Sequence, residues 1–111
     1  MDIREQQHGA IKALSPQGPI CQADAAEFHK AVSAAIASSM GRCVVDLTAT
    51  PFLDSQGLES ILTLSETLSD SGQFLKLCGV CETVREILEL TDLASSVEQY
   101  EDITSAVRSF L

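Results

Sequence analysis

The sequence is poor in positive charge, and its few cations do not gather anywhere along the chain. It holds 7 Lys and Arg residues against 16 Asp and Glu, which gives a formal net charge of −9. The cations are scattered: Arg4, Lys12, Lys30, Arg42, Lys76, Arg85 and Arg108. Nucleic acids and anionic lipid surfaces require clusters of Lys and Arg that displace counterions. We therefore expect no nucleic-acid partner, and a basic or mixed-charge protein suits this chain better. Acidity that serves solubility alone explains the charge equally well.

Long hydrophobic runs and targeting signals are also lacking. No apolar run approaches the roughly 20 residues that cross a bilayer, so no membrane insertion is expected. Residues 1–8 lack the basic start and apolar stretch of a secretion signal. The sequence thus predicts a cytoplasmic protein, in which Cys21, Cys43, Cys78 and Cys81 stay reduced.

Signatures of direct catalysis and of cofactor binding are missing as well. No glycine-rich phosphate loop follows an expected strand. His8 and His29 have no spacing that links them to a nucleophilic serine. A zinc site would need two ligands beside Cys78 and Cys81, and Cys21, Cys43, His8 and His29 provide no second pair at ligand spacing. We therefore expect neither an enzyme nor a resident cofactor or metal.

What the sequence does have is apolar material and an alternation of strand-like and helical patterns. Hydrophobic residues make up 45% of 111 residues, enough for one core, and we expect residues 1–111 to form a single domain. Strands are expected within 1–14, as a hairpin turning near His8-Gly9, and over 43–47, 74–78 and 96–100, with a short extended piece at 20–21. Residues 15–19, with two prolines and a glycine, read as a turn. The alternation predicts an α/β fold in which helices pack on a mixed sheet.

Four helices are expected from apolar residues that recur at helical spacing. Their expected inner faces are Ala25, Phe28, Val32, Ala35, Ile36 and Ser39; then Leu58, Ile61, Leu62, Ser65 and Leu68; then Val84, Ile87, Leu88 and Thr91; and finally Ile103, Ala106, Val107 and Phe110. Gly41 is a natural stop for the first helix, and Asp102 is an expected N-terminal cap for the last.

The turn Asp54-Ser55-Gln56-Gly57 stands where a strand-like run gives way to the second helix. Asp and Ser favour helix starts because their oxygens accept hydrogen bonds from backbone N–H groups without partners. Gly57 removes a side chain from the first turn, so another surface can approach the backbone. A phosphate on Ser55 would add about −1.5 to −2 charges at a helix end that favours anions. A closely fitted or acidic partner would be ejected. On spacing alone, a simple helix cap explains this turn better than a phosphorylation site does.

Residues 44–62, Val-Val-Asp-Leu-Thr-Ala-Thr-Pro-Phe-Leu-Asp-Ser-Gln-Gly-Leu-Glu-Ser-Ile-Leu, resemble the signature of the sulphate transporter and anti-sigma factor antagonist (STAS) domain. In that family a buried strand ending in Asp-Leu is followed by Asp-Ser-x-Gly-Leu at the next helix. Residues 14–20 and 72–80, and the helix end Thr91-Asp92-Leu93, extend the resemblance over nearly the whole chain. It implies a four- or five-stranded mixed sheet with about four helices, mainly on one face.

The resemblance also implies a function, that of an anti-sigma factor antagonist. The unphosphorylated domain of such a protein binds an anti-sigma factor, which is often also its kinase. Phosphorylation of the serine after Asp, here Ser55, reverses binding, and a phosphatase restores it. The expected partner surface comprises Asp54, Gln56, Gly57 and Leu58, with Cys21 and Gln22 at the end of the second strand region.

Two departures from the family pattern keep a second function open. Gln56 replaces the Ser or Thr that commonly follows the acceptor, and Cys21 replaces an acidic residue near the partner surface. Both fit a scaffold subunit that is never phosphorylated, in a membrane lipid-transport or signalling complex.

A third possibility is thiol-redox chemistry at Cys78-Gly79-Val80-Cys81, a C-x-x-C between a strand and a helix. Leu77 stands where thiol oxidoreductases have an aromatic residue. Two cysteines that merely pack as small apolar side chains explain the pattern better.

Overall fold

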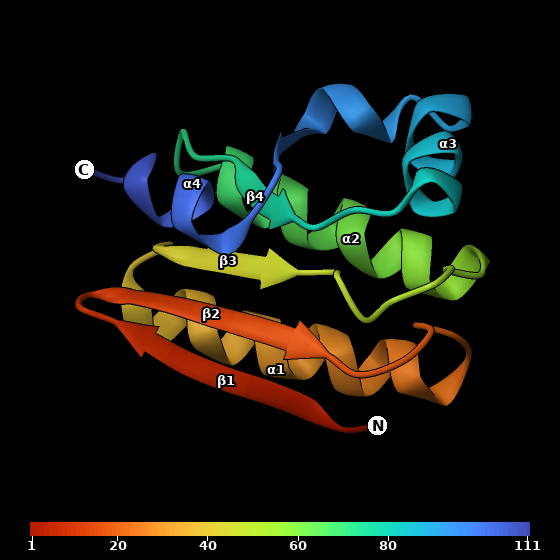
Figure 1. Ribbon diagram of the computed structural model, residues 1–111, viewed down its shortest axis with the longest axis horizontal. Coiled ribbons are helices and arrows are strands. Elements are labelled where there is room, and N and C mark those ends of the chain that lie inside the picture. The colour runs from red at the N-terminus through yellow and green to blue at the C-terminus, as the bar shows by residue number, and fades with distance from the viewer.

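The computed structural model describes residues 1–111 as an α/β fold built on a five-stranded mixed sheet (Figure 1). The strands stand side by side in chain order; the first two, β1 (Ile3–His8) and β2 (Ile11–Pro16), are antiparallel, and every other neighbouring pair is parallel. The α/β class and the expected hairpin near His8-Gly9 are therefore confirmed. The elements are β1 (Ile3–His8), β2 (Ile11–Pro16), α1 (Ala23–Ser39), β3 (Cys43–Asp46), α2 (Ser55–Ser69), β4 (Leu75–Cys78), α3 (Glu82–Leu90), the 3₁₀ turn η1 (Leu93–Ser96), β5 (Val97–Tyr100) and α4 (Ile103–Arg108).

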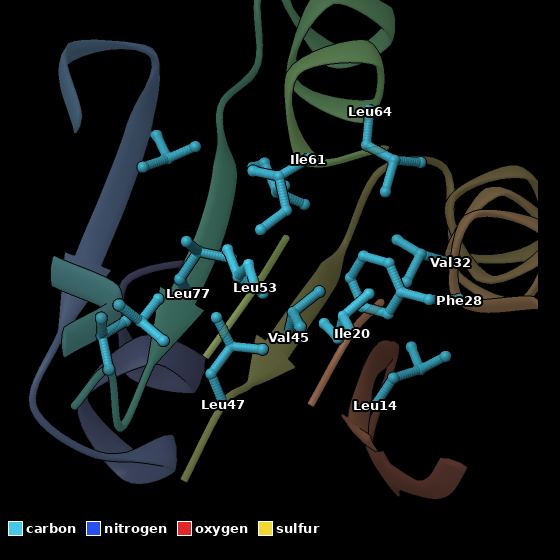
Figure 2. Packing of buried hydrophobic residues seen from close by; sticks show 14 of the residues in the cluster. Leu14, Ile20, Phe28, Val32, Val45, Leu47, Leu53, Ile61, Leu64 and Leu77 are labelled. Atoms are coloured by element: carbon cyan, nitrogen blue, oxygen red, sulfur yellow. The ribbon is translucent and has the colours of Figure 1, made fainter. Parts of the chain in front are cut away.

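Helices α1, α2 and α3 cover one face of the sheet, and α4 covers part of the other. The main core gathers 20 buried residues between the sheet and the first three helices. Figure 2 shows Phe28 and Val32 of α1 and Ile61 and Leu64 of α2 directed toward Val45 of β3. A smaller cluster under α4 contains Ile11, Val44, Cys78 and Ala106. The expectation of helices mainly on one face is confirmed. None of the helices combines the length and apolarity that spanning a membrane requires.

The inner face of α2 differs from the expected one at two leucines. Leu64 is 1% exposed and belongs to the core, whereas Leu62, expected inside, is 40% exposed. Ile61, Leu64, Ser65 and Leu68 follow the spacing of one helical face, which leaves Leu58 and Leu62 on a neighbouring stripe. The sequence-based assignment is confirmed for Ile61, Ser65 and Leu68. It was wrong for Leu62, because α2 carries two adjacent apolar stripes and Leu62 lies on the more exposed one.

The sheet brings three helix starts to one edge. β2, β3 and β4 are parallel, so their carboxyl ends lie along the same edge, where α1, α2 and α3 begin (Figure 1). β2 runs two residues into the stretch expected to be a turn, because Ser15 and Pro16 still pair with β1. Beyond it, Ile20 forms a single parallel bridge with Leu53, which prolongs the sheet toward the start of α2.

Candidate functional site

Ser55 is the first residue of α2, and its side chain is presented to solvent. The preceding residue, Asp54, has extended backbone geometry and caps the helix, because its carboxylate accepts a hydrogen bond of 2.9 Å from the Gly57 N–H. Ser55 is exposed, and its hydroxyl makes no hydrogen bond within the chain. Asp54 therefore does the capping, which leaves the Ser55 hydroxyl free for chemistry at the positive end of the helix dipole.

The second carboxylate oxygen of Asp54 reaches the start of another helix. It accepts a hydrogen bond of 3.0 Å from the backbone N–H of Gln22, the residue that precedes α1. Gln22 has a φ of 50°, a region that L-residues rarely adopt, and its own side chain caps nothing. The Gly57 N–H, followed by the Gln22 N–H, lowers the pKa of Asp54 against the opposing effect of burial. Asp54 thus joins α1 and α2 as a charged cap.

Gly57 is buried against the chain itself. A Cβ atom at this position would lie 2.2 Å from the carbonyl oxygen of Ile20, so no side chain fits without movement of the backbone. The same Ile20 carbonyl accepts a hydrogen bond of 3.3 Å from the Asp54 N–H. The surface that approaches the first turn of α2 is therefore part of this chain. The segment at Ile20, before α1, packs against the residues that begin α2.

The remaining residues of the expected partner surface divide between two grooves beside the start of α2. Gln22 and Gln56, both exposed, line a groove of about 400 Å³ between α1 and α2. Ser55 and Leu58 line a second groove of about 270 Å³ between α2 and η1. Cys21 is half-buried at the same edge of the sheet and lines neither groove. The structure gathers the expected residues at one edge of the sheet, around Ser55.

The far wall of the second groove was not expected from the sequence. It is formed by the residues that follow α3 and by η1, namely Thr91, Asp92, Leu93 and Ser96. Glu59 and Leu62 of α2 line the opposite wall. Helical periodicity indicated that α3 ended near Thr91, but no pattern in the sequence showed that this end lies beside α2. The placement is a tertiary one, in which residues of α2 and η1 line the same groove.

The two cysteines of the C-x-x-C lie on opposite sides of the sheet. Cys78 is fully buried in the cluster under α4, and burial, followed by nearby Asp46, raises its pKa to about 12. Cys81 packs against the main core, and its thiol donates to the carbonyl oxygens of Thr50 and Pro51. Both are free thiols. The buried Cys78 does not face Cys81 as a resolving thiol, which disfavours thiol-redox chemistry.

No group of three His, Cys, Asp or Glu side chains is placed to hold a metal ion. The fold and the site define a small α/β domain whose distinctive surface is the start of α2, where a free serine hydroxyl stands between two grooves. The sequence model of the STAS domain matches residues 2–106, and the chain therefore belongs to the STAS domain family.

Solved structures with this fold include stand-alone proteins and part of a transporter. A candidate anti-sigma factor antagonist from Thermotoga maritima superimposes with a TM-score of 0.87 at 24% identity, over 96% of this chain and 92% of that one. The anti-sigma factor antagonist SpoIIAA in its unphosphorylated form gives 0.72 at 12% identity, over 98% and 96%. The murine anion transporter Slc26a9 gives 0.74 at 18% identity, over 95% of this chain and 18% of the transporter. No curated protein is detectably similar in sequence.

Proposed function

We propose that this chain is a cytoplasmic regulatory domain of the anti-sigma factor antagonist type, gated by phosphorylation of Ser55. The observation that carries the proposal is the exposed, unbonded Ser55 hydroxyl at the start of α2, with Asp54 occupied as the cap. Membership of the STAS domain family and a fold shared with antagonists such as SpoIIAA support it. In this proposal the chain is a substrate and a binding partner, and it catalyses nothing itself.

The unphosphorylated chain would bind an anti-sigma factor that is also a serine kinase. The kinase would transfer the γ-phosphoryl group of ATP to the Ser55 oxygen, with loss of the hydroxyl proton and release of ADP. The new group carries about −1.5 to −2 charges and strongly hydrated oxygens. The N-terminus of α2 tolerates that charge, so the fold persists, but a partner packed closely on Ser55 would have to strip the phosphate of water. The partner leaves, and a phosphatase restores binding.

The test uses kinase-type anti-sigma factors encoded near the gene, with ATP and mapping of the phosphate by mass spectrometry. We expect phosphate on Ser55 and none on the Ser55→Ala chain, while Ser69→Ala is phosphorylated normally. Ser69 is the matched control because it is an exposed serine at the other end of α2. Ser55→Asp should weaken binding and Ser55→Ala should bind constitutively. Absence of phosphate at Ser55 with every neighbouring kinase would overturn the switch.

A non-phosphorylated scaffold of the same fold is the second candidate. It is favoured by the presence of this fold within a membrane anion transporter and by Gln56, which is exposed beside Ser55. In this role the domain would hold together a membrane lipid-transport or signalling complex. Co-purification with such a complex, unchanged by Ser55→Ala or Ser55→Asp, would select the scaffold over the switch.

A further inference from the structure

The groove between α2 and η1 combines an apolar floor with an acidic rim. Leu58 and Leu62 of α2 and Leu93 of η1 supply the apolar surface, and the exposed residues Glu59 and Asp92 supply the acidic rim. Ser55 lines the same groove. The groove is therefore continuous with the proposed phosphorylation site.

The apolar stripe of α2 in this groove is only partly covered within the chain, since Leu58 packs against the main core and Leu62 is exposed. Leu62 remains 40% exposed and Leu58 is half-buried, whereas the stripe beside it, with Ile61 and Leu64, is almost fully buried. Two leucines four positions apart on a helix present a continuous apolar strip. A strip of this kind next to polar residues is typical of a binding surface.

The charge around the groove has one sign. No Lys or Arg occurs between Arg42 and Lys76, where α2 lies, or between Arg85 and Arg108, where η1 lies. Neither Glu59 nor Asp92 forms an ion pair, whereas other acidic residues are paired, such as Glu98 with Lys76 at 3.5 Å. The groove thus has two uncompensated carboxylates.

We propose that this groove receives an amphipathic, basic segment of a partner protein. Apolar side chains of the segment would pack on Leu58, Leu62 and Leu93, and its Lys or Arg side chains would approach Glu59 and Asp92. The inference rests on the proposed function in one respect, since Ser55 lines the groove, and it names the chemistry of the partner that binds there.

The same observations disfavour other occupants. A volume of about 270 Å³ is below the roughly 300–1,000 Å³ that small-molecule sites usually have. The acidic rim would repel the anionic headgroups of a membrane surface. A second copy of this chain, with a net charge of −9, would bring further negative charge to the rim.

The probe is a synthetic helical peptide of about 15 residues, with Leu at positions spaced i, i+3, i+4 and i+7 and Lys at the flanking positions. Two control peptides have the same length: one with the same residues in scrambled order and one with Glu in place of Lys. They are titrated into the unphosphorylated ¹⁵N-labelled chain, and binding is followed by amide chemical shifts. The designed peptide should shift the amides of Leu58, Leu62, Asp92 and Ser96 and bind more tightly than either control.

Two variants test the apolar floor and the rim separately. Leu62→Ser should weaken the designed peptide by about fivefold to tenfold, since it removes most of one leucine contact. Its control, Met40→Ser, changes a side chain that is 78% exposed and lies outside the groove, at the end of α1. Asp92→Asn should weaken binding by about twofold to threefold at low salt, and not at high salt. Asn tolerates the φ of 59° at this position, and Asp70→Asn at the end of α2 is the matched control.

Equal binding of the scrambled peptide, or shifts that map to the groove between α1 and α2, would overturn the inference, as would no shift at millimolar peptide. Because the titration uses the unphosphorylated chain, it does not depend on any kinase. A kinase partner that binds and phosphorylates Ser55, yet is indifferent to Leu62→Ser, would uphold the proposed function and refute the groove. Peptide binding in the groove without any phosphorylation of Ser55 would do the reverse.

Discussion

Asp54 and Gln22 are 32 positions apart in the chain and are joined by a hydrogen bond of 3.0 Å from the Gln22 N–H to the Asp54 carboxylate. The other oxygen of that carboxylate accepts the Gly57 N–H. One side chain therefore sets the starts of two helices, and it holds Gln22 at a positive φ. The proposed partner surface depends on both helix starts.

Removal of the Asp54 side chain should destabilise the protein more than removal of an ordinary cap. The comparison is with Asp102→Ala, because Asp102 caps α4 through the Ser105 N–H and reaches no second helix. We expect Asp54→Ala to lower the midpoint of urea unfolding by the larger amount and to shift the Gln22 amide resonance. Equal midpoints for the two variants would mean that the bond to Gln22 contributes nothing.

The stability of the fold should decrease in acid partly through Asp54. Its pKa is lowered in the folded state, so the carboxylate contributes stability above its unfolded pKa, about 3.9. That contribution is lost as the pH falls through the lower, folded value. Asp54→Asn should therefore lose less free energy of unfolding than the parent chain as the pH falls from 5 to 3. Urea unfolding of both chains at several pH values measures this, and equal losses for the two chains would contradict the role of Asp54.

Gly57→Ala should be destabilising even though alanine is the better helix former. The new Cβ would meet the Ile20 carbonyl oxygen at 2.2 Å, and relief of such overpacking typically costs about 1–3 kcal/mol. Gly72→Ala separates the causes, since it has free space but a φ of 73°, for which about 1–2 kcal/mol is expected. Only Gly57→Ala should move the amide resonances around Ile20. A Gly57→Ala chain as stable as the parent would contradict the packing described.

The four thiols should divide into two reactive and two protected groups. Burial raises the pKa of Cys43 and Cys78 to about 12, so at pH 8 only about one in ten thousand of each is a thiolate. Cys21 and Cys81 are half-buried. Brief alkylation of the native protein, read by mass spectrometry, should modify Cys21 and Cys81 and spare the other pair until urea is added. Rapid native labelling of Cys78, or activity in an insulin-reduction assay that Cys81→Ser abolishes, would revive the thiol-redox possibility.

Lys76 should contribute measurably to the attachment of α4. Its ammonium group lies 2.7 Å from the Ser109 hydroxyl and 4.0 Å from the centre of the Phe110 ring, and its side chain is 13% exposed. Lys76→Met keeps the apolar stem and removes these contacts, so a loss of about 1–3 kcal/mol is expected. Hydrogen exchange in α4 should rise at the same time. Lys30→Met, on the exposed side of α1, should leave both stability and exchange unchanged.

Most of the fold could be predicted from local patterns. The spacing of apolar residues predicts the helices, β-branched runs predict the strands, and residue type predicts the cap at Asp102. Each of these patterns depends on neighbours within a few positions. On α2, Leu62 was wrongly placed inside and Leu64 was left out, because the leucines of this helix form two stripes of similar apolarity. Which stripe meets the sheet depends on the tertiary packing of α2. The end of β2 was placed too early because Pro16 still fits at the rim of the β1–β2 pair.

The geometry around Ser55 could be predicted where it is local and not where it depends on distant partners. The cap at Asp54 follows from the chemistry of a helix start, whereas Ser55 was singled out as the phosphate acceptor by the resemblance to the STAS domain and stays a prediction. The bond from Gln22 to Asp54 and the contact of Gly57 with Ile20 join segments more than thirty positions apart, and nothing in the spacing of residues reveals them. The wall formed by Asp92 and its neighbours was missed for the same reason.

The single bridge between Ile20 and Leu53 has a mechanical consequence. It fastens the two loops of the candidate site to the end of the sheet, immediately before Ser55, and leaves that end of α2 little room to shift. A phosphate on Ser55 would thus change the charge and the hydration at the start of α2 while the backbone there stays in place. Phosphorylation would then regulate binding without a conformational change in this chain, because the partner would respond only to the altered chemistry of the surface.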